Sequence, residues 1–231
     1  MARRVVAFFD FDRTLIGANS GTLWIQAERR AGRLSRLEMA VAAAYFLRYY
    51  LSIIDMDEAM TKALGTVIGE REEVIEERTR AWYRAEVRQH LLRAALETVE
   101  DHRRQGHLLV LLTTSSPYLS RAVVEDLRLD DYGATAYEID DEGRFTGALV
   151  KPTCYGAGKV THARIIAERH GSSVEDAYFY TDSYSDRALL EIVRHPRAVN
   201  ADPRLRRLAR RRSWPLLDWR ERGGRAVGGL A

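Results

Sequence analysis

The amino-acid sequence predicts an α/β fold with a doubly wound, mostly parallel sheet and an all-helical segment inserted after its first strand. Short apolar runs alternate with helical segments along most of the chain, which is the pattern of parallel strands buried on both faces. The segment at residues 20–88 has no strand-like run, so it is expected to form a cap above the sheet. Clusters of polar residues follow the apolar runs, at the sheet edge where open α/β folds place their active sites.

The first strand is predicted at residues 5–9, an apolar run that ends at an acidic turn. Helices are expected from there to about residue 106. Capping boxes at residues 35–38 and 55–58 open two of them, because a Ser or an Asp is followed three residues later by a Glu. Residues 70–105 are polar and helical throughout, which predicts either two helices or one bent helix.

The second half of the chain changes to short strands separated by helices. Strands are predicted at residues 108–112, 177–181 and 198–200, and a β-hairpin at 134–139 and 144–150. Helices are predicted to begin at Ser116-Pro117 and at Pro203, and to cover 160–170 and 186–193. The elements predict an α/β core domain at 1–19 and 89–221, a helical cap domain at 20–88 and a flexible, glycine-rich tail at 222–231.

The composition is that of an ordinary globular protein, with 231 residues of which 46% are hydrophobic and 30% are charged. The single cysteine, Cys154, cannot form an internal disulfide, which favours a reducing, cytoplasmic location. The longest apolar stretch, residues 39–54, includes Arg48 and is shorter than the ~20 residues that span a bilayer. The composition therefore argues against collagenous, disordered, secreted and membrane-spanning classes.

Arginine dominates the basic residues. All but three of the 36 Lys and Arg residues are arginines, there are 33 Asp and Glu residues, and the formal net charge is +3. The densest arginine run, at residues 204–212, is interpreted as a solvated helix face rather than as a patch that binds a phosphate backbone. No zinc-finger or RNA-recognition motif accompanies this run, so we expect no nucleic-acid partner.

Two aspartates directly follow the first predicted strand. Side chains two apart in an extended chain project to the same side, so Asp10 and Asp12 present two carboxylates together at the edge of the sheet. The alternative is a single aspartate that caps the next helix, which would require only one of the two.

A hydroxyl cluster and a lysine come next along the chain. The cluster Thr114, Ser115 and Ser116 follows the strand at 108–112, where hydroxyl groups can bind a phosphate oxygen or simply cap a helix. Lys159 lies at the start of a predicted helix, where a positive charge opposes the helix dipole. Because the chain has only three lysines, this placement suggests that Lys159 meets an anion.

A second pair of acids, Asp182 and Asp186, follows the strand predicted at 177–181. Their spacing of four residues around a helix start lets both face one cleft, although either could be an ordinary capping residue. Four such polar clusters in this order are difficult to explain as helix caps alone.

With these clusters the chain resembles the haloacid dehalogenase (HAD) superfamily, and within it the phosphoserine-phosphatase-like hydrolases of subfamily IB. The four motifs of that family are an Asp-x-Asp-x-Thr loop, here at residues 10–14, a strand-end Ser or Thr, a single Lys and a late acidic pair. The likeness extends from residue 5 to about residue 219 and includes the segments at 154–160 and 199–203. It implies a Rossmann-like sheet with a helical cap, and Mg²⁺-dependent phosphoryl transfer through an aspartyl-phosphate.

The resemblance implies catalytic roles for four residues. Asp10 would attack phosphorus, and Asp12 would protonate the leaving oxygen and later deprotonate water. Asp10, Asp182 and the main-chain carbonyl of Asp12 would hold Mg²⁺. Lys159 would supply a second positive charge, because two like charges 4 Å apart repel by ~4 kcal/mol at an effective dielectric constant of 20.

The resemblance also implies residues that bind substrate or support the metal. Thr114 would hydrogen-bond the transferring phosphoryl group, with Ser115, Ser116, Lys159 and Asn19 as further substrate-binding residues. Asp186 would hold either the metal's waters or Lys159 from behind the metal site, where Ser183 is also expected. The expected partner is a small phosphorylated metabolite.

Departures from the family pattern bear on the substrate. Arg13 stands where many relatives have glycine and is interpreted as a tolerated change. Asn19 stands where phosphoserine phosphatases have a glutamate that holds the substrate ammonium, and residues 181–186 read Thr-Asp-Ser-Tyr-Ser-Asp where those enzymes have Gly-Asp-Gly-x-Asn-Asp. The last two differences leave the phosphoryl chemistry intact and weaken an assignment as phosphoserine phosphatase proper, which stays an alternative. A second alternative is a phosphatase of lipid-like phosphates, because the apolar helix predicted at 39–54 could touch a membrane instead of packing in a bundle. A non-enzymatic alternative is a receiver-like phosphoacceptor module, although such modules are shorter and lack the insert.

Overall fold

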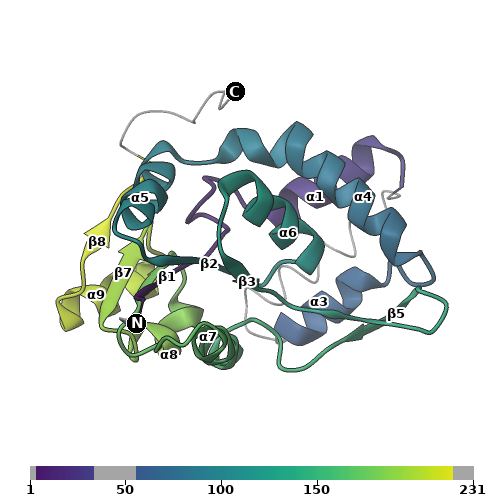
Figure 1. Cartoon of the computed structure of the whole chain (residues 1–231). Coiled ribbons are helices and arrows are strands. Elements are labelled where there is room, and N and C mark those ends of the chain that lie inside the picture. Colours follow the sequence, from purple (N-terminus) through teal and green to yellow (C-terminus); the bar gives the residue numbers. More distant parts are fainter. Residues whose placement is uncertain (1–3, 34–55, 221–231) are drawn as a thin grey trace.

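The computed structural model describes residues 4–33 and 56–220. A six-stranded sheet lies at its centre in the order β3-β2-β1-β6-β7-β8, and all neighbouring strands in it are parallel (Figure 1). The strands are β1 (Val6–Phe9), β2 (Leu108–Leu112), β3 (Asp131–Gly133), β6 (Tyr178–Thr181), β7 (His195–Val199) and β8 (Leu216–Leu217). The predicted α/β class with a mostly parallel sheet is therefore confirmed.

Strand β1 lies in the middle of the sheet, and its four apolar residues are completely buried. Its last residue, Phe9, is level with Leu111 of β2 and with Tyr180 of β6. Parallel pairing in this register brings the loops after these three strands to the same edge of the sheet. That edge is the carboxyl edge at which open α/β sheets bind their ligands.

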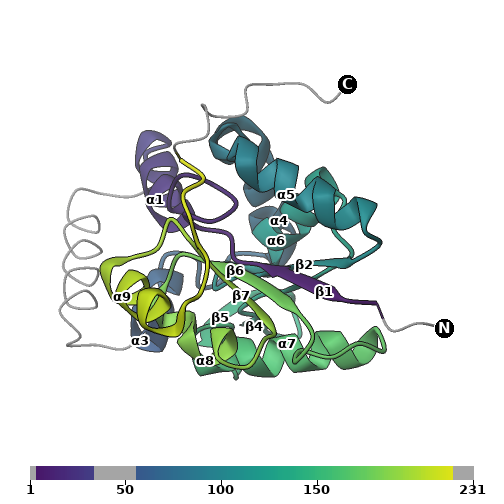
Figure 2. The same ribbon diagram turned by 90° about the vertical axis from the view of Figure 1, so that its left-hand side faces the viewer.

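Alternate residues of β1 belong to two different hydrophobic clusters, because successive side chains of a strand point to opposite faces. Ala7 and Phe9 pack with residues of α5 (Arg93–Arg104) and α6 (Pro117–Leu127). Val6 and Phe8 pack with residues of α7 (Ala157–Arg169), α8 (Arg187–Leu190) and α9 (Pro203–Arg212). Figures 1 and 2 show α5 and α6 on the opposite side of the sheet from α7 and α8.

The segment between β1 and β2 is helical in its described part and adds no strand to the six-stranded sheet there. It contains α1 (Ser20–Arg30), α3 (Met56–Leu64) and α4 (Glu72–Trp82). Helix α4 continues through a π-helical turn and a 3-10 turn, Tyr83–Val87 and Arg88–His90, to α5. The prediction for residues 70–105 is thus confirmed as two helices.

Two features predicted in this segment, the capping box at 35–38 and the apolar stretch at 39–54, lie outside the described residues. The helix expected after the second capping box is observed as α3. Among the helices that the structure describes, none has both the length and the apolarity to cross a bilayer.

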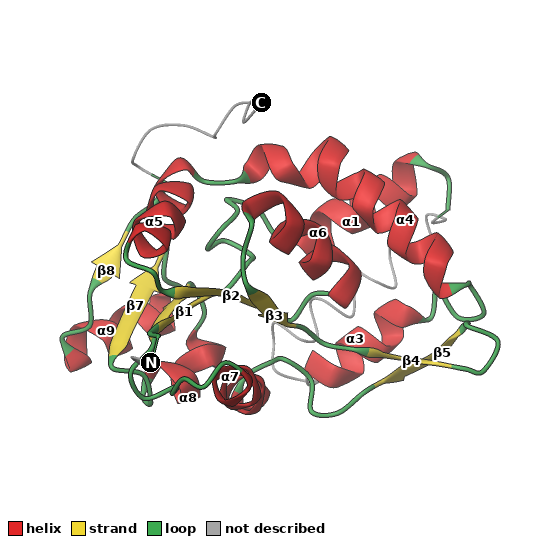
Figure 3. Cartoon of the chain, viewed as in Figure 1, coloured by secondary structure: helices red, strands yellow, loops and turns green. Residues whose placement is uncertain are grey.

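The predicted β-hairpin forms from β4 (Tyr137–Ile139) and β5 (Phe145–Leu149), which pair antiparallel. Its Phe145 is buried in a separate small cluster with Leu64, Val67, Ile75 and Tyr118. The hairpin therefore packs against the helices that follow β1, and Figure 3 shows it beside α3, away from the six-stranded sheet.

Several boundaries differ from the prediction. The helix predicted at 186–193 is a 3-10 turn at Tyr184–Asp186 followed by the short α8, because the chain turns again before β7. The helix predicted at 160–170 begins earlier, at Ala157. Strands β3 and β8 were not predicted, because segments of three and two residues carry no periodicity that the sequence could reveal.

Candidate active site

Asp10 and Asp182 begin the loops that follow β1 and β6, and both are buried. The main-chain N–H of Asp10 donates to the Tyr180 carbonyl at 2.9 Å, so the loop after β1 starts in register with the neighbouring strand. The sheet therefore brings together two carboxylates that are far apart in sequence. Their charges interact, since the repulsion from Asp10 contributes to the raised pKa of Asp182.

Lys159 lies between two of the acids. Its Nζ is 2.7 Å from Asp10 Oδ1 and 2.8 Å from Asp186 Oδ2, and its side chain is only 3% exposed. Burial by itself lowers the pKa of Lys159, but the carboxylates of Asp10 and Asp186 more than offset this effect and hold that pKa above its usual value. Thr181 fixes the second acid, because its hydroxyl donates to the same Asp186 oxygen at 2.7 Å. Lys159 is thus a charged ammonium group that its hydrogen bonds hold beside the Asp10 carboxylate.

The remaining negative charge of the site is poorly compensated. Burial raises the pKa of Asp10 to about 7, even though Lys159 acts in the opposite direction. Burial, followed by repulsion from Asp10, raises the pKa of Asp182 to about 8. Within the described part of the chain, no group donates a hydrogen bond to the Asp182 carboxylate or forms an ion pair with it. Three buried acids, Asp10, Asp182 and Asp186, lie around a single lysine, which is an environment that favours a further cation.

The donor set fits a hard divalent cation. Mg²⁺ prefers carboxylate and carbonyl oxygens and usually keeps several waters. Asp10, Asp182 and the main-chain carbonyl of Asp12 could provide such ligands. No group of three His, Cys, Asp or Glu side chains arranged for a metal occurs among residues 4–33 and 56–220, so a metal here would need main-chain or water ligands in addition.

Asp12 is held at the start of α1. Its Oδ1 accepts from the main-chain N–H of Ser20 at 2.7 Å, and its Oδ2 accepts from the Ser20 hydroxyl at 3.1 Å and from Asn19 Nδ2 at 3.3 Å. Burial raises the pKa of Asp12, and the hydrogen bonds from Ser20 offset part of the rise. Sequence analysis did not single out Ser20, and its only signal was its place at the first turn of the first helix after the aspartates. Asn19, predicted to bind substrate, also caps α1, since its Oδ1 accepts from Thr22 N at 2.9 Å.

The three hydroxyl residues after β2 have different surroundings. Thr114 donates to the main-chain carbonyl of Cys154 at 3.1 Å. The hydroxyl of Ser115 lies 3.0 Å from that of Ser20 and so connects the end of β2 with the group that holds Asp12. Ser116 is the N-cap of α6, where its hydroxyl accepts a main-chain N–H. Of the three, Ser115 is therefore the one that contacts a residue holding Asp12, Thr114 bonds the Cys154 carbonyl, and Ser116 acts as a helix cap.

The loop after β6 carries Asp186 and Ser183, the last two residues predicted to belong to the site. Asp186 reaches Lys159, as described above. Ser183 caps the 3-10 turn, and its hydroxyl lies 2.8 Å from that of Ser185. In this arrangement Asp186 positions the lysine, and Ser183 stabilises the turn that carries Asp186.

A contact from the C-terminal part of the chain fixes the loop after β1. The side-chain amide of Asn200 donates to the carbonyl of Arg13 at 2.7 Å and accepts from the main-chain N–H of Trp219 at 2.9 Å. Arg13 has a positive φ of 56°, a conformation in which glycine is favoured. Asn200 lies in the segment at 199–203 that carried part of the family resemblance, but its contact with Arg13 spans most of the chain and has no local signal.

Comparisons with known proteins identify the family of this chain. The model of the haloacid dehalogenase-like hydrolase family matches residues 7–191. The chain is 30% identical over 219 residues to the "Inhibition of morphological differentiation protein" of Streptomyces azureus, covering 94% of this chain and 79% of that protein. It is 25% identical over 219 residues to a histidinol-phosphatase of Neisseria meningitidis, covering 93% of this chain and 99% of the relative.

Solved structures share the fold. A protein of unknown function from Bordetella pertussis superposes with a TM-score of 0.87 at 26% identity, covering 94% of this chain and 100% of that one. A phosphoserine phosphatase with a phospho-aspartyl intermediate analogue superposes with a TM-score of 0.67 over 95% of both chains, and at 18% identity this likeness concerns the fold alone. From the match over residues 7–191 and the acids, hydroxyls and lysine gathered at the carboxyl edge of the sheet, we conclude that this chain belongs to the haloacid dehalogenase-like hydrolase family.

Proposed function

We propose that this protein is a Mg²⁺-dependent phosphatase that hydrolyses a small phosphomonoester through an aspartyl-phosphate on Asp10. The observation that carries the proposal is the placement of Asp10. One of its oxygens accepts from Lys159 at 2.7 Å, and Asp182 stands beside it as a second buried acid that lacks a hydrogen-bond donor among the described residues. The carboxylate thus lies where a cation and a phosphoryl group can both reach it.

The first half of the reaction transfers the phosphoryl group to the enzyme. The Asp10 carboxylate attacks phosphorus, an oxygen–phosphorus bond forms, and the bond from phosphorus to the leaving oxygen breaks. Asp12 donates a proton to that oxygen, so the product leaves as a neutral alcohol. The raised pKa of Asp12 supports this role, because a buried carboxyl group keeps its proton to higher pH.

The second half returns the enzyme to its starting state. Water attacks the phosphorus of the aspartyl-phosphate, Asp12 takes a proton from that water, and the bond to Asp10 breaks to release inorganic phosphate. Bound Mg²⁺ supplies positive charge that reduces the repulsion between the phosphate and the Asp10 carboxylate. Asp10, Asp182 and the main-chain carbonyl of Asp12 would hold it.

Lys159 and the hydroxyls after β2 are proposed to bind the phosphoryl oxygens. Lys159 is kept charged by Asp10 and Asp186, and Thr181 orients the second of these acids. Thr114, with Ser115 and Ser116 as further donors, would complete the anion site.

Residues 20–88 are proposed to form the cap that selects the substrate. Helix α1 begins at Ser20, which holds Asp12, so the insert is connected directly to the chemistry. Helix α3 is attached to the segment just before Cys154, the residue whose carbonyl accepts from Thr114, because Asp57 accepts hydrogen bonds from Lys151 and, at 2.7 Å, from Thr153. We also infer a reducing, cytoplasmic location from the buried free thiol of Cys154.

The substrate is proposed to be a small phosphorylated metabolite. One relative is named a histidinol-phosphatase, and several structural neighbours are phosphoserine phosphatases, so both phosphomonoesters belong in a screen. The residue expected to hold a substrate ammonium is Asn19 rather than an acid, which weighs against phosphoserine. Membership in a hydrolase family argues against the receiver-like module.

The test is release of phosphate from para-nitrophenyl phosphate and a panel of phosphomonoesters, with Mg²⁺ and with a chelator. We expect multiple turnovers with Mg²⁺, loss of activity with the chelator, and loss of activity in Asp10→Asn with the fold retained by circular dichroism. Near-normal Mg²⁺-dependent turnover by Asp10→Asn would refute the assignment of the nucleophile.

A further inference from the structure

A cavity of about 660 Å³ adjoins the site on the side of α9. Asp182, Arg13, Asn200 and Asp202 line this cavity, and Asp182 is the residue that it shares with the site described above. Four arginines of α9 line the rest, together with Arg220: they are Arg206, Arg207, Arg210 and Arg211. The proposed chemistry uses none of these arginines, so their concentration beside Asp182 requires a separate explanation.

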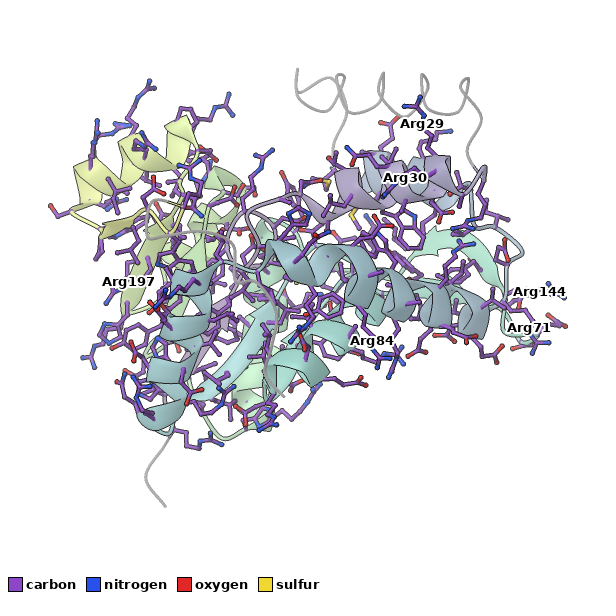
Figure 4. The ribbon with its side chains drawn as sticks, turned by 90° about the horizontal axis from the view of Figure 1, so that it is seen from above. Arg29, Arg30, Arg71, Arg84, Arg144 and Arg197 are labelled. Carbon is purple, nitrogen blue, oxygen red and sulfur yellow. The ribbon has the colours of Figure 1, made fainter. Side chains whose placement is uncertain are left out.

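The four α9 arginines that line the cavity lack acidic partners among the described residues. None of the guanidinium groups of Arg206, Arg207, Arg210 and Arg211 forms a hydrogen bond or an ion pair with another described residue. Many arginines elsewhere form ion pairs. One of them is Arg30, labelled in Figure 4, which pairs with Glu86. Figure 4 also shows several nitrogen-tipped side chains on α9, the pale yellow helix. Like charges four residues apart on a helix repel each other, so this arrangement weakens the helix unless an anion balances it.

The acids of the cavity do not neutralise this charge. Asp202 is the N-cap of α9, where its Oδ1 accepts the main-chain N–H groups of Arg204 and Leu205 at 2.7 and 2.8 Å. Its Oδ2 accepts the main-chain N–H of Tyr184 at 2.7 Å. Asp182 lines the cavity beside the proposed metal site, and the two aspartates are outnumbered by the arginines that line the same cavity. The cavity therefore remains strongly positive at neutral pH.

Arg13 provides an independent second observation. It occupies a left-handed backbone conformation with φ of 56°, which is unfavourable for any residue with a β-carbon, and Asn200 holds its carbonyl at 2.7 Å. Residues kept in such conformations concentrate at functional sites. Arg13 directly follows Asp12 and lines the cavity, so a position where many relatives have glycine carries a cation at the side of the cavity that adjoins the site.

We propose that Arg13 and the arginines of α9 form a second anion-binding subsite, which makes the preferred substrate a phosphomonoester with a second phosphate group on its leaving part. Asp182 borders both the cavity and Asp10, so a molecule whose first phosphate lies at Asp10 can extend its second phosphate toward α9. The inference rests on the proposed phosphatase function and specifies its substrate class. A duplex nucleic acid fits less well, because it would follow the outer surface of α9, including Arg204 and Arg212, which do not line the cavity shared with Asp182.

The test compares glucose 1,6-bisphosphate with glucose 1-phosphate, two probes that differ by one phosphate group. The cavity variant is Arg206→Gln with Arg210→Gln, which removes two cations one turn apart. The control is Arg204→Gln with Arg212→Gln, which removes the same charge from the same helix at residues that do not line this cavity, and which also breaks the exposed ion pair of Arg212 with Glu191. Thermal unfolding of both variants checks that α9 is retained.

We expect the wild-type protein to prefer the bisphosphate in kcat/KM, and the preference to fall as salt is raised. The cavity variant should lose about five- to tenfold of that preference, since two charge contacts at a partly exposed site are removed. The control should keep the wild-type ratio. The subsite would be overturned if the cavity variant kept the wild-type kcat/KM preference for the bisphosphate. It would also be overturned if the control lost as much of that preference as the cavity variant. The arginines would instead be assigned to nucleic acid if the wild-type protein bound duplex DNA, both variants weakened that binding equally, and neither changed the kcat/KM ratio of the two sugar phosphates.

A binding measurement separates this inference from the proposed function. Calorimetric titration of the Asp10→Asn protein with both sugar phosphates reports affinity without turnover. Tighter binding of the bisphosphate, lost in the cavity variant, supports the subsite even if no phosphomonoester is hydrolysed. Equal affinity for the two probes refutes the subsite even if para-nitrophenyl phosphate is a good substrate.

Discussion

Replacing Lys159 by methionine removes the cation that holds two buried carboxylates. Nζ lies 2.7 Å from Asp10 and 2.8 Å from Asp186, and the three side chains are between 2% and 9% exposed, so water cannot screen the loss. Removing one partner of a buried ion pair costs about 3–5 kcal/mol, because the other partner is left buried and charged. We expect Lys159→Met to lower the free energy of unfolding by about this amount at pH 8, measured by urea denaturation in a chelator.

Protonation of the buried carboxyl groups reduces this penalty, so Lys159→Met should lower the free energy of unfolding less at pH 5 than at pH 8. The matched control is Lys151→Met, which removes an ion pair with Asp57 at a lysine that is 61% exposed and should cost less than about 1 kcal/mol. The double variant Lys159→Met with Asp186→Asn should recover part of the stability, because one of the two stranded charges is gone. The reasoning would be refuted if Lys159→Met lowered the free energy of unfolding by less than about 1 kcal/mol at pH 8, or if its effect grew toward pH 5.

Three further predictions concern the loops around the site. Burial raises the pKa values of Asp10 and Asp182 from 3.8 to about 7 and about 8, so the folded state binds more protons than the unfolded state over that range. The metal-free protein should therefore lose stability as the pH rises from about 4 to about 8. The Asp182→Asn variant should show a weaker dependence of the free energy of unfolding on pH. A free energy of unfolding that increases with pH across this window would contradict the prediction. Ser20→Ala removes one hydrogen bond to Asp12 that lowers its pKa, so the pH profile of kcat should shift to higher pH, and an unshifted profile would show that Asp12 is not the titrating group. Arg13→Gly relieves an unfavourable φ of 56° and should raise the free energy of unfolding by about 1 kcal/mol, whereas a destabilised variant would show that the conformation carries no strain.

The sequence predicted the centre of the fold well, because β1 and β2 are uninterrupted apolar runs that end at polar residues. The same pattern identified Asp10 and Asp182, since buried strands of a parallel sheet have their carboxyl ends at one edge. Lys159 was recognised by its rarity and its unfavourable place at a helix start, and the structure shows the two carboxylates that explain it.

Features that depend on distant contacts could not be predicted in this way. The hairpin of β4 and β5 was expected, but its packing around Phe145 against α3 and α4 is decided by side chains far apart in sequence. The contact of Asn200 with Arg13 joins the two ends of the chain. The arginine run of α9 was interpreted as a solvated face, because only the folded chain shows that four of its side chains share a cavity with Asp182.

The most direct test of the proposed mechanism is to find where the phosphoryl group is attached during turnover. The protein, mixed with para-nitrophenyl phosphate and Mg²⁺ and quenched in acid within one turnover, can be reduced with borohydride, which converts an aspartyl-phosphate to homoserine, and analysed by peptide mass spectrometry. The mechanism predicts the modification at Asp10, and its absence when Mg²⁺ is chelated. Modification of another residue, or rapid release of phosphate with none at Asp10, would contradict it.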